Sequence, residues 1–251
     1  MPRIRWLTLM IAVVPWVASP SATASVELNP GTSFTHLAVF ANDANNSNGG
    51  TGLAEFESTA FPFPFSDSHT SSDGSASATS SYELSDAGFE ITFEHARAGS
   101  NDASGEAQSY GEIFFRLDTD AVYELTGAYS ANDSEGRHVI LDVFLDDQTT
   151  GTNLFGSTQD SYGDTPNESF VLGGVGGDFS NHLAGSPSGP LTAGHEYRLF
   201  YGALIGDRPL PAVQPASASG FVRLAIVPEP STAGLLLLGL IAIASPLARR
   251  Q

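Results

Sequence analysis

Apolar and polar residues alternate along most of the chain between residues 25 and 226. The segment 89–95 reads Phe-Glu-Ile-Thr-Phe-Glu-His, which places its apolar side chains on one face of a strand and its acidic ones on the other. The segment 139–146, Val-Ile-Leu-Asp-Val-Phe-Leu-Asp, also carries apolar residues on its second face, which predicts a central strand followed by a turn over 147–151. The same pattern predicts strands at 34–40, 112–117, 122–129, 152–155, 169–172, 196–205 and 220–226.

These strands define the expected fold class. No segment between the two ends has the 3.6-residue apolar period of an amphipathic helix, and Gly, Asp, Asn, Ser and Pro separate the strands. Many short strands with polar turns predict an all-β, antiparallel β-sandwich with a jelly-roll-like topology. Segments 41–52 and 66–81 are poor in hydrophobic residues and are expected to be long loops. The Pro-rich segment 206–217 is expected to cross the surface.

The last 25 residues have a different, three-part pattern. Val227-Pro228-Glu229-Pro230 is a stiff, extended peptide, because each proline fixes its own φ and restricts the residue before it. The apolar stretch 233–247 would form a short transmembrane helix of about 22 Å. Arg249 and Arg250 follow it and favour the cytoplasmic side, which leaves the bulk of the chain outside.

This tail resembles the PEP-CTERM sorting signal of Gram-negative bacteria, which an exosortase-type membrane transpeptidase recognises and removes. The resemblance covers about a tenth of the chain; a plain C-terminal anchor helix is the alternative. It implies a transient anchor in the inner membrane, a final place in the cell envelope, cell surface or extracellular matrix, and a role beside exopolysaccharide or in biofilm. The run 191–199 followed by 218–226 is similar to the closing hairpin of secreted PEP-CTERM domains.

The N-terminus agrees with export. Arg3 and Arg5 form a basic region before the apolar segment 6–17, and Ala22-Thr23-Ala24 is a cleavage site of the A-x-A type. The sequence therefore predicts a signal peptide over 1–24, an exported domain over 25–226 and a sorting tail over 227–251. A retained N-terminal anchor is the alternative.

Composition excludes several classes of function for the predicted exported domain. Residues 25–226 contain no Lys, Cys, Met or Trp, and they hold 27 of the 28 acidic residues against six arginines, a net charge of −21. Nucleic-acid binding is excluded because it needs a basic surface. Without Lys or Cys there is no Walker-type phosphate site, Schiff-base lysine, thiol nucleophile or Cys-based zinc site.

Candidate chemistry is limited to oxygen ligands and acid pairs. Asp142, Asp146 and Asp147 are candidate calcium ligands, although no EF-hand spacing occurs and a site would need loops distant in sequence. Asp118-Thr-Asp120 and Glu55-Phe-Glu57 would place two carboxylates about 7 Å apart on one strand face, in or near the range of glycosidases. A solvated strand face explains the same pattern. No catalytic residue is assigned.

Sugar binding is the remaining possibility. Aromatic side chains stack on sugar rings, and the candidates are Phe61-Pro-Phe-Pro-Phe65 and the tyrosines Tyr110, Tyr129, Tyr162 and Tyr201; packing in the core is the alternative for all of them. The residues favour a non-catalytic protein, and the PEP-CTERM resemblance implies that it is an envelope or matrix protein associated with exopolysaccharide, with calcium as an optional cofactor. A polysaccharide-active hydrolase or lyase on a jelly-roll scaffold is the second hypothesis, and a structural spacer without a ligand is the third.

Overall fold

The computed structural model describes a set of segments that all lie within one unit, Thr23–Glu229. The described residues are 24–31, 35–42, 51–56, 63–70, 76–85, 87–97, 106–131, 137–161, 169–172, 179–207 and 216–228. Their fifteen strands are β1 (Val26–Leu28), β2 (Thr35–Asn42), β3 (Thr51–Phe56), β4 (Phe63–Thr70), β5 (Ala76–Ser85), β6 (Gly88–Arg97), β7 (Glu106–Leu117), β8 (Ala121–Ala131), β9 (Arg137–Asp147), β10 (Thr152–Ser161), β11 (Ser169–Val171), β12 (Phe179–Gly185), β13 (Ser188–Leu191), β14 (Glu196–Asp207) and β15 (Ala216–Pro228).

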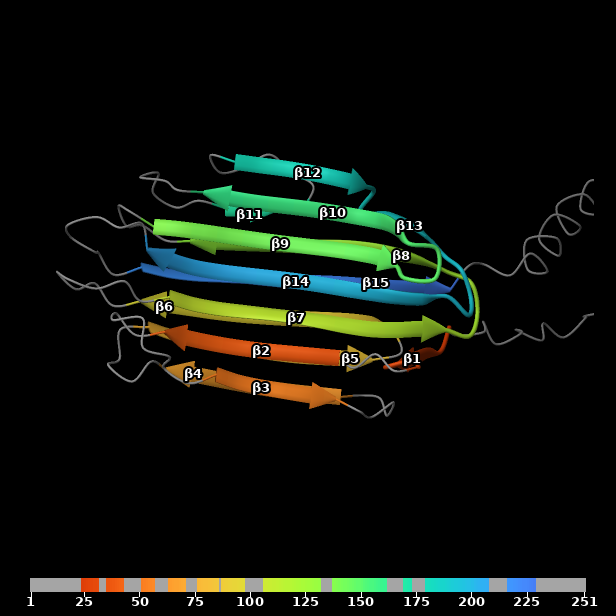
Figure 1. Cartoon of the computed structure of the whole chain (residues 1–251), viewed down its shortest axis with the longest axis horizontal. Coiled ribbons are helices and arrows are strands. Elements are labelled where there is room, and N and C mark those ends of the chain that lie inside the picture. Colours follow the sequence, from red (N-terminus) through yellow and green to blue (C-terminus); the bar gives the residue numbers. More distant parts are fainter. Residues whose placement is uncertain are drawn as a thin grey trace, which may run out of the picture. The chain divides into compact units, whose positions relative to one another are not determined.

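The strands form two antiparallel sheets. Sheet A has the order β12-β10-β9-β14-β7-β2-β3 with β1 beside β7, and sheet B has the order β11-β8-β15-β6-β5-β4 with β13 beside β8. In Figure 1 the strands of sheet A run from β12 at the top to β3 at the bottom, and sheet B lies behind them. Successive strands β6, β7, β8 and β9 alternate between the sheets, so most neighbours within a sheet are distant in sequence.

One hydrophobic core joins the inner faces of both sheets. Strict alternation along β7 buries every second residue, and Phe115 of that strand packs edge-to-face on Phe89 of β6 with ring centroids 5.0 Å apart. Phe93 of β6 stacks over Tyr201 of β14 at 6.5 Å. Buried aromatic rings contribute large apolar areas, so these contacts across the sheets are a main source of stability.

A short series of polar side chains crosses this core; we call Ser80, His95, Ser109 and Tyr129 the interior polar chain. His95 Nδ1 lies 2.7 Å from the Tyr129 hydroxyl, and His95 Nε2 lies 2.8 Å from Ser109 Oγ. Ser109 Oγ also hydrogen-bonds Ser80 Oγ. Ser109 belongs to sheet A and the other three to sheet B, so the interior polar chain ties the sheets together.

The predicted all-β, antiparallel class is confirmed for the described residues, and every strand predicted from alternation is present. The prediction of a loop over 66–81 is wrong, because Ser66–Thr70 and Ala76–Ser81 form most of the β4–β5 hairpin. In the part of β5 that falls within 66–81, the buried positions are held by Ala76, Ala78 and Ser80, small residues that hide the alternation. Strand β4 is an edge strand, the place where Pro64 is tolerated.

The expected closing hairpin is also wrong. Residues 196–199 belong to β14 in sheet A, whereas residues 218–226 belong to β15 in sheet B, so the two runs lie in opposite layers. The ends of the predicted loops 41–52 and 206–217 extend β2, β3, β14 and β15, and the rest of each lies outside the described residues. Within the described ranges no helix is long and apolar enough to span a membrane, and the helix predicted at 233–247 lies beyond them.

Candidate functional site

The outer face of sheet A carries partly exposed aromatic side chains from four strands, and we call it the aromatic face. Its rings are Phe40, Tyr110, Phe114, Phe144 and Phe200. They lie outside because the alternate residues of the same strands fill the core. The β9–β14–β7 register sets Phe144, Phe200 and Glu112 in one row across the sheet.

The rings of the aromatic face are arranged in pairs. Phe40 and Tyr110 stack almost parallel, with centroids 5.2 Å apart and planes 17° from each other. Phe144 and Phe200 lie 5.9 Å apart and are tilted by 49°. Two aromatic pairs on one sheet face form a ledge of the kind that packs against flat, weakly polar rings.

Arg198 provides the polar centre of this face. Its Nε and Nη2 donate to Glu112 Oε1 at 3.1 and 2.5 Å, and its Nη1 donates to Asp146 Oδ2 at 3.4 Å. The guanidinium lies 5.5 Å above the Phe200 ring, a cation–π contact. Asn153 donates to the other oxygen of Asp146 at 3.0 Å. Arg198 is thereby held in place with its side chain about a third exposed, 31 %.

Gly202 lies buried in the middle of the aromatic face. It pairs with Asp142 on one side and Tyr110 on the other, and a Cβ there would lie in ordinary contact with Phe200 and Asp142, at 3.7 Å or more. Burial raises the pKa of Asp142, an effect that Thr158 opposes through a hydrogen bond and Asp160 adds to through its charge. The centre of the aromatic face therefore carries a carboxyl group that protonates more readily than usual beside the Phe200 ring.

Sheet B has a groove of a different character on its outer face. The groove has a volume of about 510 Å³ and is lined mainly by hydroxyl and acidic side chains, with one exposed ring: Thr79, Ser81, Glu90, Thr92, Glu94 and Phe221. Glu90 and Glu94 are four residues apart on β6, a spacing of about 13 Å along a strand, which exceeds glycosidase separations. Glu90 also lies 3.6 Å from Arg223. The groove does not bring two carboxylates together for hydrolysis.

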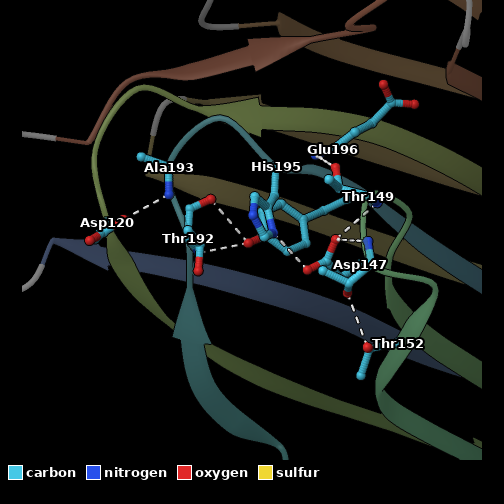
Figure 2. A network of polar contacts seen from close by, with 10 residues as sticks. Asp120, Asp147, Thr149, Thr152, Thr192, Ala193, His195 and Glu196 are labelled. Carbon is cyan, nitrogen blue, oxygen red and sulfur yellow. Dashed lines mark hydrogen bonds and ion pairs between the residues drawn. The ribbon is translucent and has the colours of Figure 1, made fainter.

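A polar network at one end of the sandwich joins three turns (Figure 2). His195 Nδ1 lies 2.8 Å from Asp147 Oδ2, and Asp147 Oδ1 accepts the N–H groups of Thr149 and Thr150 at 3.0 and 3.1 Å. Burial raises the pKa of Asp147, but hydrogen bonds from His195 and Thr150 outweigh burial and leave the pKa lowered. In the β7–β8 turn, Asp120 Oδ1 accepts the N–H of Ala193 at 2.7 Å. These hydrogen bonds hold the turns together. None of the bonds just described involves a Ser or Cys side chain that could act as a nucleophile.

The acid pair predicted at Asp118 and Asp120 does not form on a strand face. Both residues lie in the turn between β7 and β8, where Asp118 Oδ1 accepts from Ser25 N at 2.7 Å and Asp120 Oδ1 accepts from Ala193 N. Their carboxylates hold two different segments of backbone. The side chains of Glu55 and Glu57 lie outside the described residues.

The three candidate calcium ligands are not gathered around one point. Asp142 and Asp146 lie on the aromatic face, whereas Asp147 points to the inner side and binds His195. Among the described residues no group of three or more His, Cys, Asp or Glu side chains is placed to hold a metal ion.

The other predicted residues are distributed as follows. Tyr110 lies on the aromatic face, Tyr129 and Tyr201 are buried in the core, and Tyr162 lies outside the described residues. Val227 and Pro228 end β15, opposite Val122 and Ala121 of β8, which confirms the extended conformation predicted for them. Ala24 is buried. The remaining processing residues lie outside the described residues: Ala22, Glu229, Pro230, Arg249 and Arg250.

Comparison with known proteins does not assign the chain to a family. No protein-family model and no curated protein matches the chain. Two solved structures, of infectious bursal disease virus Gt and Gx strains, align with 84 % of this chain at 9 % and 10 % identity, with TM-scores of 0.16 and 0.15. The alignments span 66 % and 80 % of the viral chains. TM-scores this low do not indicate a shared fold.

Proposed function

We propose that this protein is an exported, non-catalytic component of the cell envelope or extracellular matrix that binds exopolysaccharide through the aromatic face of sheet A. The observation that carries the proposal is the set of paired, partly exposed rings around Arg198 on one sheet face. Sugar rings have apolar faces that stack on aromatic side chains, and their hydroxyl groups hydrogen-bond to guanidinium and carboxylate groups.

Export and sorting form the second part of the proposal. The signal peptide, the Val227-Pro228-Glu229-Pro230 motif, the short transmembrane helix and the Arg249-Arg250 stop together support an exosortase-type transpeptidase as processing partner. The strand β15 runs directly into this motif, which supports a tail presented in an extended form. A jelly-roll-like connectivity, in which successive strands alternate between layers, belongs to the same proposal.

Charge points to a class of polysaccharide. The outer face of sheet A carries Glu112, Asp142, Asp146 and Glu196 against Arg116 and Arg198. The whole chain has a net charge of −18. Like charges across an interface are unfavourable, so neutral or amino-sugar polymers fit this surface better than uronic acid polymers. Calcium bound between the protein and an acidic polymer would remove that preference.

A retention assay tests the proposed function. The exported protein is incubated with the host's own extracellular polysaccharide, with calcium or with chelator, and the polymer is sized afterwards. We expect intact polymer to retain the wild-type protein, and Phe200→Ala with Tyr110→Ala to weaken retention at least about tenfold. The matched control is Phe221→Ala, which removes the exposed ring of sheet B and should leave retention unchanged.

The outcomes separate the hypotheses. Loss of retention with Phe221→Ala but not with the double variant would place binding on the groove of sheet B and contradict the aromatic face. Shortened polymer would favour the hydrolase or lyase. If the polymer neither retains the protein nor is shortened, the remaining hypothesis is a sorted spacer without a sugar ligand.

A further inference from the structure

Ser25 is tied to the β7–β8 turn at both of its backbone polar groups. Its N–H donates to Asp118 Oδ1 at 2.7 Å, and its carbonyl oxygen accepts the N–H of Asp118 at 3.2 Å. These bonds continue the antiparallel ladder in which Val26 of β1 pairs with Leu117 of β7. A carboxylate is thus held against the nitrogen of the residue that the A-x-A motif predicts as the first of the mature chain.

We propose that Asp118 is the binding site for the new N-terminus, and that the α-ammonium group of Ser25 forms an ion pair with Asp118 Oδ1 after processing. The inference rests on the proposed export, through cleavage after Ala24. Hydrolysis of the Ala24–Ser25 peptide bond consumes one water molecule, leaves a carboxylate on Ala24 and frees an amine on Ser25, which takes up a proton near neutral pH. A charge-assisted hydrogen bond then replaces a neutral one, and such bonds are stronger.

The fold also sets the order of events. Ala24 is only 3 % exposed and belongs to the hydrophobic core, and both backbone groups of Ser25 are bonded. Ser25 itself is exposed, but the Ala24 side of the scissile bond is buried, and the Ser25 backbone is bonded, once β1 has docked on β7. Cleavage precedes that docking, and Asp118 receives Ser25 as an already charged terminus.

The same turn supplies a matched control. Asp120 is two residues from Asp118, and its Oδ1 accepts the N–H of Ala193 at 2.7 Å, a bond of the same length to a different segment. Replacing either aspartate by asparagine keeps an oxygen acceptor and removes the charge. Only Asp118→Asn removes the charge that is hydrogen-bonded to Ser25.

The absence of lysine makes the test specific. Because the chain contains no Lys, the α-amino group is the only primary amine of the mature protein, and an amine-reactive reagent reports on it alone. The exported protein is purified as the host makes it, its intact mass is measured, and the rate of amine labelling is followed from pH 6 to pH 10. Wild type is compared with Asp118→Asn and Asp120→Asn.

We expect the wild-type amine to titrate above its ordinary range of about 7.7–8.0, because a nearby carboxylate favours the charged form. Near neutral pH, Asp118→Asn should label about 3- to 10-fold faster than wild type, because each pKa unit changes the free-amine fraction tenfold. Asp120→Asn should label at the wild-type rate. A wild-type amine that titrates in the ordinary range, at a rate unchanged by Asp118→Asn, would overturn the inference.

A different result would contradict the predicted cleavage site instead. If the intact mass shows a chain that does not begin at Ser25, the predicted cleavage is wrong. The ion pair is then tested on the chain 25–251, released in detergent from an N-terminal fusion by a protease that leaves Ser25 first. Titration in the ordinary range there would overturn the role of Asp118 as well.

Discussion

His95 Nε2 lies 2.8 Å from Ser109 Oγ, and through this contact a histidine of sheet B is hydrogen-bonded to a serine of sheet A inside the core. Both side chains are almost fully buried. Neutral imidazole donates at one nitrogen and accepts at the other. One consistent arrangement has Tyr129 donating to Nδ1 and Nε2 donating to Ser109.

The first prediction concerns this contact. Ser109→Ala should lower the free energy of unfolding by about 1–3 kcal/mol, because it leaves His95 Nε2 buried without its partner. Urea unfolding followed by circular dichroism measures the change. The control is Ser81→Ala. Ser81 is an exposed residue of β5 whose hydroxyl makes a long contact of 3.5 Å with Ser66, so the substitution should change the free energy of unfolding by less than about 0.5 kcal/mol.

The second prediction is a pH dependence. Burial lowers the pKa of His95 from 6.5 to about 3 in the folded protein. The unfolded chain takes up a proton below pH 6.5 and the folded chain does not, so the stability linked to His95 is complete above pH 6.5 and falls as pH drops towards 3. At pH 5 the loss is about 2 kcal/mol.

The comparison that isolates this effect is wild type against His95→Gln. Carboxylates titrate in both proteins, so the difference between their unfolding free energies at pH 7, 6 and 5 reports the histidine. The variant should be less stable than wild type at pH 7 and should lose that disadvantage as pH falls. Parallel curves would show that His95 is not held neutral by the fold.

The third prediction concerns two glycines with nearly the same backbone. Gly185 has φ of +73° and Gly151 has φ of +69°, but a Cβ at Gly185 would lie 1.7 Å from the carbonyl oxygen of Leu154, whereas one at Gly151 would meet nothing within 4 Å. Gly151→Ala should cost about 1 kcal/mol for the left-handed conformation. Gly185→Ala should cost about 3 kcal/mol or more, because backbone must move. Equal melting temperatures for the two variants would contradict the close approach.

The fourth prediction concerns the clamp between turns shown in Figure 2. Asp147 and His195 are 48 residues apart and bonded at 2.8 Å, so a double-mutant cycle with Asp147→Ala and His195→Ala should give a coupling of about 0.5–1.5 kcal/mol at pH 7. The pKa of Asp147 is lowered from 3.8, so the contribution of its carboxylate is complete above pH 3.8 and is lost as pH falls through the lowered value. Zero coupling would show that the two turns are held independently.

Large apolar residues made most strands predictable. Phe89, Ile91 and Phe93 alternate so clearly that β6 follows from the sequence alone, and the second apolar face of 139–146 correctly predicts an internal strand. The β4–β5 hairpin was missed because Ala76, Ala78 and Ser80 occupy the buried positions in the first half of β5. Small residues suffice there because side chains of the facing sheet fill the space between the sheets. A contact between sheets cannot be predicted from the local sequence pattern.

The aromatic face is formed by the pairing of strands and could not be predicted from the local sequence pattern. Phe40, Tyr110, Phe144 and Phe200 come from β2, β7, β9 and β14, which are separated in sequence and brought together only by strand order and register. The apolar second face of 139–146 contained part of the signal. The prediction of an acid pair at Asp118 and Asp120 was wrong because both residues lie in a turn, where their side chains do not share the face of a strand.

Val227 and Pro228 finish β15 in register with β8, so the sandwich and the proposed sorting motif share one strand. In the proposed membrane-held precursor, only residues 229–232 separate that strand from Ala233, the first residue of the apolar stretch. Four residues reach at most about 14 Å when fully extended. Under the proposed processing, the transpeptidase would act on a very short connecting segment and would have to separate the end of β15 from β8 to lengthen it, so removal of the tail would coincide with fraying of that strand.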